Sequence, residues 1–220
     1  MTLCSAIEPL PSAEDAAFYG EDLLWMEGAI GEFLLRLDML RRLRLARGER
    51  DPVEHYKARI KSARSMQEKL ARQGLCVDAQ TARTAVHDGA GVRIVCPFVD
   101  DIQTAAALIR RIPGLTVVRE KDYVASPKPN GYRSHHMILR YPVSLADETR
   151  PVYLEVQLRT IAMDCWACLE HQMKYKHEIP NAKLIVGELK ECAEGLASAD
   201  LSMQTIRDWI AGENQEVYDL

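Results

Sequence analysis

The sequence predicts an α/β (α+β) fold, in which a mixed β-sheet is flanked by helices and helical extensions lie at both ends. Short segments rich in β-branched residues alternate along the chain with longer segments of helical period. One predicted strand, at residues 152–159, alternates apolar and polar side chains without a break. A polar loop at residues 120–136, with two prolines and an Asn-Gly turn, joins two strand-like segments.

The N-terminal extension is predicted to be a single long helix. Ser12 and Asp15 have the spacing of a capping box, and helical periodicity then continues to about Arg47, where Gly48 is a natural stop. Apolar residues cover more than one stripe of this helix and part of the last one: Leu23, Leu24, Ile30, Phe33, Leu34, Met203, Ile206 and Ile210. Apolar surface beyond one stripe tends to be buried against another subunit, so we expect a homo-oligomer.

A basic helix face is predicted after an ambiguous segment. Residues 53–61 show no clean period, and we predict an extended conformation there. The following helix, at residues 62–72, has an apolar side formed by Ala63, Met66 and Leu70. Its other side carries Ser65, Lys69 and Arg72 at helical spacing, and Lys61 precedes the helix N-terminus, where free N–H groups attract anions. A solvated basic face is the plainer alternative.

The remaining elements follow the same rules. Further strands are expected at residues 91–98, 115–118 and 137–141, and further helices at 100–111, 160–176 and 181–211, with Pro180 as the break between the last two. Residues 144–151 are expected to be a polar connection. We expect one domain over residues 1–220, with a catalytic core at about 53–176 and helical extensions at 12–48 and 181–212.

Composition limits the class of protein. The 28 basic and 32 acidic residues give a net charge of −4, which argues against duplex nucleic-acid binding as the main task. No apolar run approaches the length of a membrane span, and the N-terminus lacks a signal pattern, so we expect a cytoplasmic protein. The six cysteines show no disulfide framework, and the C-x-x-C at residues 165–168 is expected to pack within a helix.

The polar loop has the chemistry of a nucleotide site. It reads EKDYVASPKPNGYRSHH, and its prolines hold Lys128 in an extended backbone before the Asn130-Gly131 turn. Tyr132 follows the turn at the predicted start of a strand, with Arg133 and His136 close behind it. A flat ring beside fixed cations suits a base and its phosphates.

Two carboxylates are expected to meet on neighbouring strands. Glu155, Gln157 and Arg159 share one face of the strand at residues 152–159, and Asp88 precedes the strand that carries Arg93. Asp88 and Glu155 together predict a Mg²⁺ site, because this cation takes few protein ligands beside substrate phosphate.

The sequence fits other types of catalytic site less well than a magnesium-dependent nucleotide site. A His-Asp phosphohydrolase site at residues 87–88 lacks further ligands, and the chain has no G-x-S-x-G motif and no Gly-rich phosphate loop.

Five segments in order resemble the synthetase domain of the RelA/SpoT family: RIKSARSMQEKLAR, DGAGVRIVCPFVDDI, KDYVASPKPNGYRSHH, EVQLRT and AMDCWACLEHQMKYK. The resemblance covers residues 53–176, and the chain is most similar to the small, stand-alone alarmone synthetases. It implies a nucleotidyltransferase-related fold and a (p)ppGpp synthetase that transfers pyrophosphate from ATP to the ribose 3′-OH of GDP or GTP, with release of AMP.

The resemblance also implies a role for each candidate residue. Arg59 and Arg93 would stack on the adenine of ATP. The ATP phosphates would be bound by four residues: Lys61, Ser65, Lys69 and Arg72. The acceptor nucleotide would be bound by Tyr132, stacked on guanine, and by Lys128, His136, Gln157 and Arg159. Asp88 would bind Mg²⁺, and Glu155 would position or deprotonate the 3′-OH and contact the metal.

Two departures and three alternatives remain. Gly89 stands where the family usually has a large aliphatic residue, and residues 55–58 lack the aromatic-x-Thr-Gly segment typical of the product-activated branch. The alternatives are a toxin-type relative that modifies the tRNA 3′ end, an enzyme that makes adenosine alarmones, and a non-catalytic regulator that binds nucleotide or single-stranded RNA. The resemblance also implies that the expected homo-oligomer is a tetramer.

Overall fold

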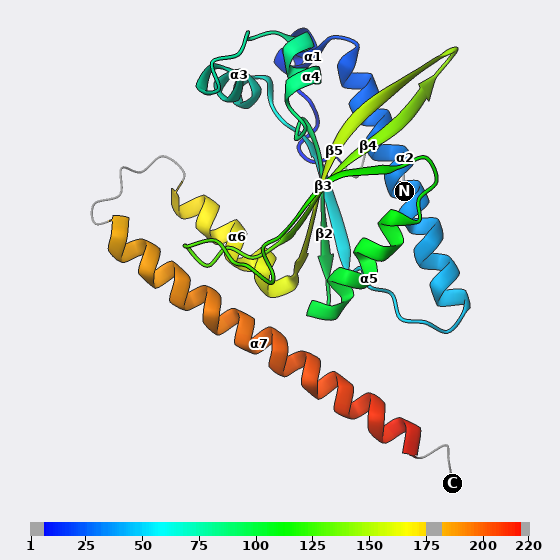
Figure 1. The fold of residues 1–220 in the computed structure, drawn as a ribbon, viewed down its shortest axis with the longest axis vertical. Helices are drawn as coiled ribbons and strands as arrows, with labels where there is room; N and C mark the ends of the chain where they lie inside the picture. The colour runs from blue at the N-terminus through cyan, green and yellow to red at the C-terminus, as the bar shows by residue number, and fades with distance from the viewer. Residues whose placement is uncertain (1–6, 175–181, 217–220) are drawn as a thin grey trace.

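The fold is built on a five-stranded mixed sheet. The computed structural model describes residues 7–174 and 182–216 (Figure 1). Its strands are β1 (His55–Ile60), β2 (Ala90–Cys96), β3 (Thr116–Asp122), β4 (His135–Leu145) and β5 (Glu148–Thr160), in the spatial order β1-β2-β5-β4-β3. Only the β2–β5 pair is parallel among them. The predicted α/β fold with a mixed sheet is therefore confirmed, and the ambiguous segment before residue 62 is a strand.

Helices cover one face of the sheet with apolar side chains. Helix α2 (Asp22–Ala46) packs on β2, β4 and β5, and α5 (Val99–Arg110) packs on β2 and β5. Both lie on the same side of the sheet, which Figure 1 shows edge-on. The apolar residues of the alternating strand, including Leu154, Val156 and Leu158, are fully buried there. Their polar neighbours consequently point to the other face.

The polar face is arranged in rows across the strands. One row joins Arg59 on β1, Gly91 on β2, Glu155 on β5, Ile138 on β4 and Arg119 on β3. The adjacent row is Lys57, Arg93, Gln157, His136 and Lys121. Paired residues in neighbouring strands point to the same face, so segments far apart in sequence supply one polar surface.

The predicted single N-terminal helix is wrong: the segment forms two helices. The capping box of Ser12 and Asp15 is present and starts α1 (Ala13–Tyr19). Gly20 then adopts a left-handed φ of 54°, which ends α1 before α2 begins. Because glycine pays no steric penalty there, the chain turns at that point. Helix α2 ends as expected, next to Gly48 at φ 74°.

Three strands, β3, β4 and β5, are longer than predicted. Strand β3 continues through the charged residues 119–122, and the supposed polar connection at 144–151 is a hairpin that turns at Ala146 between β4 and β5. Charged side chains mark loops in sequence patterns, but an edge strand and a solvated hairpin end accept them. Tyr132, expected at a strand start, lies in the loop before β4.

The remaining helices lie around the polar face of the sheet, which we also call the open face. Helix α3 (Ala63–Arg72) has Ser62 as its N-cap and buries Ala63, Met66 and Leu70, as predicted. A short helix that the sequence analysis did not assign, α4 (Ala79–Ala85), is capped by Asp78. Helix α6 (Ile161–Lys174) contains the C-x-x-C as expected, and α7 (Ala182–Glu216) is longer than predicted. The predicted break at Pro180 lies outside the described residues.

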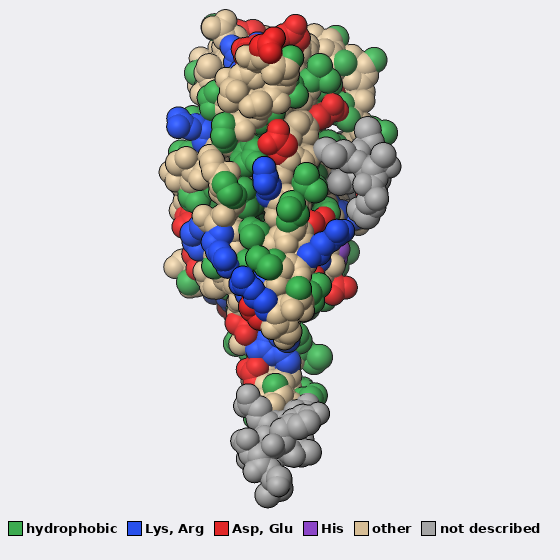
Figure 2. All heavy atoms as spheres, turned by 90° about the vertical axis from the view of Figure 1, so that its right-hand side faces the viewer, with side chains coloured by type: hydrophobic (Ala, Val, Ile, Leu, Met, Phe, Trp, Pro, Cys, Tyr) green, Lys and Arg blue, Asp and Glu red, His purple; other side chains and the backbone are tan. Residues whose placement is uncertain are grey.

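Apolar side chains remain exposed on the two terminal helices. Leu23, Ile30, Phe33 and Leu34 of α2 are buried within the chain itself, so of the five listed residues of this helix only Leu24 is exposed. Exposed apolar residues not singled out from the sequence include Leu35 and Met39 on α2 and Trp209 on α7. Figure 2 shows apolar side chains spread over the α2 side and the far end of α7 projecting below the body. Among the described residues, no helix is both long and apolar enough to cross a membrane.

Candidate active site

Two polar clefts on the open face meet at Glu155. The first has a volume of about 230 Å³ and is lined by the following residues: Glu8, Pro9, Lys57, Ala58, Arg59, Asp88, Gly91, Val92, Arg93, Glu155 and Gln157. The second has a similar volume of about 230 Å³ and is lined by Arg119, Lys121, Tyr123, Lys128, His136, Ile138 and Glu155. We call them the β1–β2 cleft and the β3–β4 cleft. Glu155, on the strand between them, lines both.

Asp88 forms a charged cluster with two lysines on the β1–β2 side. Its Oδ2 atom lies 3.1 Å from Nζ of Lys61 and 2.7 Å from Nζ of Lys69. Burial by itself would raise the pKa of Asp88, but the hydrogen bonds and charges of Lys69 and Lys61 hold that pKa below its ordinary value. Helix α3 supplies Lys69, and Lys61 directly follows β1. The structure thus brings together three residues that the sequence analysis had assigned to a metal and to phosphates.

The Asp88 carboxylate has the features of a magnesium ligand. Its Oδ1 atom is buried and has no hydrogen-bond partner among the described residues. The second expected ligand, Glu155, lines the same cleft. In the described part of the chain, no group of three or more His, Cys, Asp or Glu side chains could hold a metal by itself. Two carboxylates and an open cleft fit Mg²⁺, which usually completes its shell with water and substrate phosphate.

Both oxygens of Glu155 are engaged by neighbours in the polar rows. Nδ1 of His136 lies 3.4 Å from Oε1, and Nε2 of Gln157 donates a hydrogen bond of 2.9 Å to Oε2. Burial would raise the pKa of Glu155, but the hydrogen bond and charge of His136, with the Gln157 bond, lower it below the ordinary value. Glu155 is thus an ionised carboxylate held rigidly between the two clefts.

Tyr132 connects this carboxylate to a buried arginine. The Tyr132 hydroxyl lies 2.9 Å from Nε2 of His136 and accepts a 2.7 Å hydrogen bond from Arg159. The ring has Lys128 Nζ 4.6 Å and the Arg159 guanidinium 5.2 Å from its centroid, and its edge packs near Trp166 of α6. The ring therefore lies behind the β3–β4 cleft, with cations around it.

The candidate residues fall into three groups. Those that line a cleft are Arg59, Asp88, Arg93, Lys128, His136, Glu155 and Gln157. Those that contact a lining residue from behind are Lys61, Lys69, Tyr132 and Arg159. Ser65 and Arg72 are exposed on α3 and line neither cleft. Gln157, expected on the acceptor side, lines the β1–β2 cleft.

Sequence reasoning missed three residues of the β3–β4 cleft. Arg119, Lys121 and Tyr123 lie at successive period-two positions, and Tyr123 has Lys128 Nζ 4.8 Å from its ring centroid. Residues 119–122 are all charged and show no apolar–polar alternation, so the predicted strand ended at Val118. In the structure, a register shift between Val117 and Arg119 interrupts the pairing of β3 with β4 at the same point.

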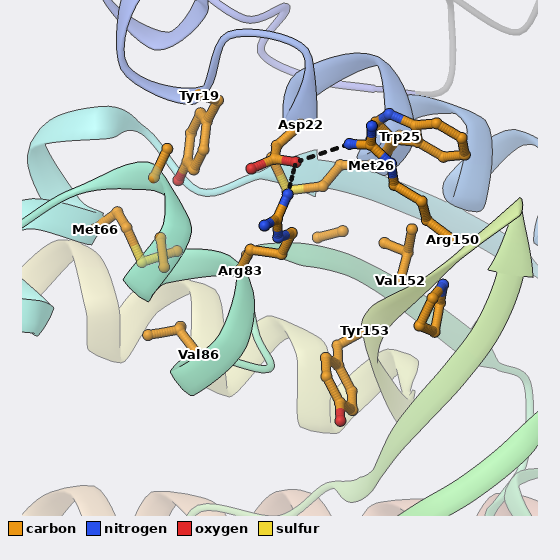
Figure 3. A pocket seen from close by; sticks show the side chains of 15 residues that line it. Tyr19, Asp22, Trp25, Met26, Met66, Arg83, Val86, Arg150, Val152 and Tyr153 are labelled. Carbon is orange, nitrogen blue, oxygen red and sulfur yellow. Dashed lines mark hydrogen bonds and ion pairs between the residues drawn. The ribbon is translucent and has the colours of Figure 1, made fainter. Parts of the chain in front are cut away.

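An apolar cavity of about 50 Å³ lies behind the Asp88 loop (Figure 3). Trp25, Met26 and Met66 line it, and an Asp22 carboxylate bound by Arg83 and Arg150 lies at one side. Gly89 also lines it, and a Cβ built on this glycine would lie 3.4 Å from both methionine side chains. Because the charged residues that line it, Asp22, Arg83 and Arg150, are paired with one another, we assign the chemistry to the two polar clefts.

The fold and the site together define a class of protein: a mixed-sheet α+β domain with two polar clefts that share one carboxylate, Glu155. The family model described as "Region found in RelA / SpoT proteins" matches residues 58–180, and the chain belongs to this family. The expected resemblance is thereby confirmed.

Individual relatives agree with this assignment. The chain is 44% identical to GTP pyrophosphokinase YwaC of Bacillus subtilis over 66% of this chain and 69% of the relative. It is 33% identical to GTP pyrophosphokinase YjbM of the same organism, over 86% of each chain. The crystal structure of small alarmone synthetase 1 from Bacillus subtilis, bound to its product pppGpp, aligns with a TM-score of 0.77 and 32% identity, covering 86% of this chain and 96% of that one.

Proposed function

We propose that the chain is a (p)ppGpp synthetase, a GTP/GDP pyrophosphokinase that transfers pyrophosphate from ATP to the ribose 3′-OH of GDP or GTP. The observation that carries the proposal is the position of Glu155, which lines two clefts of equal volume on one face of the sheet. A transfer between two nucleotides needs a donor and an acceptor held in line, with one group at the point where they meet. The names of the relatives support the same activity.

The β1–β2 cleft is assigned to the donor, ATP. Arg59 and Arg93 line it on either side of Gly91, whose missing side chain leaves the floor open between them. Planar guanidinium groups stack on aromatic rings, which suits adenine. Lys61, just before α3, and Ser65, Lys69 and Arg72 on α3 are assigned to the phosphates.

The β3–β4 cleft is assigned to the acceptor. Arg119, Lys121 and Lys128 make it strongly basic, which suits a nucleoside di- or triphosphate. His136 lines it, and Tyr132 and Gln157 reach it through hydrogen bonds to His136 and Glu155 respectively. Arg159 is one step further away and donates to both Tyr132 and Gln157. We retain stacking of Tyr132 on guanine as part of the proposal, and the adjacent Tyr123 offers a second ring for the same base.

The reaction forms a bond between the acceptor 3′-oxygen and the β-phosphorus of ATP. The bond from that phosphorus to the bridging α–β oxygen breaks, and AMP leaves with this oxygen. Glu155, ionised and fixed by His136 and Gln157, orients the 3′-OH and accepts its proton. Asp88 and Glu155 would hold Mg²⁺, which neutralises charge on the transferred phosphates when bound. Lys61 and Lys69 add positive charge at the same place.

A radiolabelled transfer assay tests the function and its alternatives together. Purified protein is incubated with Mg²⁺ and ATP labelled at the γ-phosphate, and with GDP, GTP, AMP or tRNA as acceptor. Label in ppGpp or pppGpp with equimolar AMP release is the expected result. Label only in tRNA or in adenosine alarmones would replace the proposed acceptor. Absence of any transfer, with retained nucleotide binding, would identify a non-catalytic regulator.

We also propose an assembly, a location and a candidate RNA-binding surface for the chain. The exposed apolar side chains of α2 and α7 would form the interfaces of a homo-oligomer, most simply a tetramer, with both clefts facing outward. The chain is proposed to act in the cytoplasm as one synthetase domain over residues 1–220. A local patch at Lys57, Arg59 and Arg64 is the surface that a tRNA or single-stranded RNA would use.

A further inference from the structure

One carboxylate on α6 contacts an arginine from each side of the site. Oδ1 of Asp164 lies 3.1 Å from NH1 of Arg93 and 3.0 Å from NH1 of Arg159. Arg93 lines the β1–β2 cleft. Arg159 extends towards the β3–β4 side through Tyr132 and His136. The same oxygen atom therefore joins groups that belong to different clefts.

The charges make this contact strong. The Arg159 side chain is 5% exposed and that of Asp164 is 17% exposed, so the pair is shielded from water. A buried guanidinium without a counter-charge is costly, and two guanidinium groups beside each other repel. Asp164 is the acidic partner of both arginines, and its removal would release both together. Its helix is fixed by the hydrogen bond of Trp166 to the backbone of Leu189 on α7.

Movement of either arginine would change the contacts of residues at the other cleft. An adenine that displaces the Arg93 guanidinium changes the ion pair of Arg93 with Asp164, and hence the hydrogen bond that Asp164 accepts from Arg159. Arg159 in turn donates to Gln157, which donates to Glu155, and to Tyr132, which contacts His136. This is a contiguous path of one ion pair and several hydrogen bonds from the donor to the acceptor side.

We propose that Asp164 is a positioning residue that couples the binding of the donor nucleotide to the binding of the acceptor nucleotide. The proposal rests on the assignment of the two clefts given above. Asp164 lines neither cleft. Asp164 acts on nucleotide binding through Arg93 and Arg159, because its ion pairs fix the positions of both guanidinium groups. Binding of either nucleotide then pre-orders the arginine of the other site, which is positive cooperativity.

Isothermal calorimetry of the full chain measures this coupling. GDP is titrated in the absence and in the presence of saturating α,β-methylene ATP, an analogue that cannot transfer its pyrophosphate, and the ratio of the two Kd values is the coupling factor. We expect GDP to bind at least about fivefold more tightly to the wild-type complex, at the lower end of typical coupling. Asp164→Asn, which keeps the shape and removes the charge, is expected to bring the ratio close to one.

Two further variants separate coupling from loss of structure. Asp164→Glu retains the charge but displaces the oxygen, so the ratio is also expected to fall while the protein stays folded. Asp101→Asn removes the carboxylate of another arginine pair, 2.9 Å from Arg50 on the opposite side of the sheet. This control is expected to lower the melting temperature and leave the ratio unchanged.

Each outcome has a separate meaning. Failure of the wild-type chain to bind either nucleotide would overturn the proposed function itself. A wild-type ratio near one, or a wild-type ratio retained in both folded Asp164 variants, would overturn the coupling role alone. Steady-state kinetics give the second readout: the variants are expected to raise KM for both nucleotides more than the Asp101→Asn control does.

Discussion

Nδ1 of His136 on β4 lies 3.4 Å from Oε1 of Glu155 on β5, so a ring that lines one cleft contacts the carboxylate shared by both. The two residues are not directly paired across the strands: His136 pairs with Gln157, and Ile138 pairs with Glu155. The contact is therefore diagonal, within reach of long side chains on adjacent strands. It fixes the Glu155 carboxylate at the border and holds it ionised.

The first prediction concerns the two carboxylates. Glu155→Gln removes the proton acceptor, and Asp88→Asn removes the charge expected to hold Mg²⁺. Each is expected to lower the transfer rate by about 10²–10⁴-fold, the usual contribution of a positioned acid or base, while circular dichroism shows an intact fold. Transfer from labelled ATP to GDP measures the effect. Turnover within a few-fold of wild type in either variant would remove that residue from the mechanism.

The second prediction concerns pH. The pKa values of Asp88 and Glu155 are lowered in the folded chain, so their ionised forms contribute stability above the ordinary values of 3.8 and 4.5. That contribution is lost as the pH falls below those values and through the folded pKa. Urea denaturation between pH 7 and pH 3 is expected to show a steeper acid loss of stability for wild type than for Glu155→Gln. Parallel profiles would show that Glu155 titrates equally in both states.

The third prediction concerns Tyr132. Tyr132→Ala is expected to weaken GDP or GTP binding by about 1–3 kcal/mol, the usual worth of base–aromatic stacking, and to leave ATP affinity largely unchanged. Tyr132→Phe keeps the ring but removes the hydroxyl that contacts His136 and Arg159. If the ring binds the base, the Phe variant retains most of the affinity in calorimetry. An equal loss in both variants would assign the role to the hydroxyl.

The fourth prediction concerns the cavity behind Asp88. Gly89 has no left-handed φ, and a Cβ there would meet Met26 and Met66 at ordinary contact distance. Gly89→Ala is therefore expected to stabilise the chain by about 0.4–1 kcal/mol, by restricting the unfolded state. The matched control is Gly131→Ala, at φ +87° with a Cβ only 2.5 Å from that of Ala193, which is expected to destabilise. Thermal melts compare the two, and destabilisation by Gly89→Ala would contradict the geometry.

The fifth prediction concerns assembly. Light scattering at micromolar concentration is expected to give a multiple of the 24.8 kDa chain mass, most simply four. Leu35→Lys on α2 and Ile210→Lys on α7 place a charge on the exposed apolar surfaces and are expected to reduce that mass. Leu10→Lys, at an equally exposed apolar position outside the helices, is the control. A wild-type mass near 24.8 kDa would exclude the oligomer.

Features that depend on local period and local capping could be predicted before the structure was known. Alternation along residues 152–159 placed Glu155, Gln157 and Arg159 on one face, because successive side chains of a strand point to opposite sides. Helical spacing placed Lys69 opposite the buried side of α3, and the segment order was specific enough to identify the family. These properties need no knowledge of what packs against the segment.

Which segments are neighbours could not be predicted from local patterns and became known from the three-dimensional fold. The parallel pairing of β2 with β5 sets Gly91 beside Glu155 across a long stretch of chain, and the edge strand β3 adds Arg119 and Lys121 to the same rows. The double contact of Asp164 depends on where α6 lies against both strands. Such pairings follow from burial and strand order summed over the whole chain, and no local pattern encodes them. For that reason the sequence was enough to propose Asp88 and Glu155 as functional carboxylates. The structure was needed to show that Glu155 lies between two clefts and lines both.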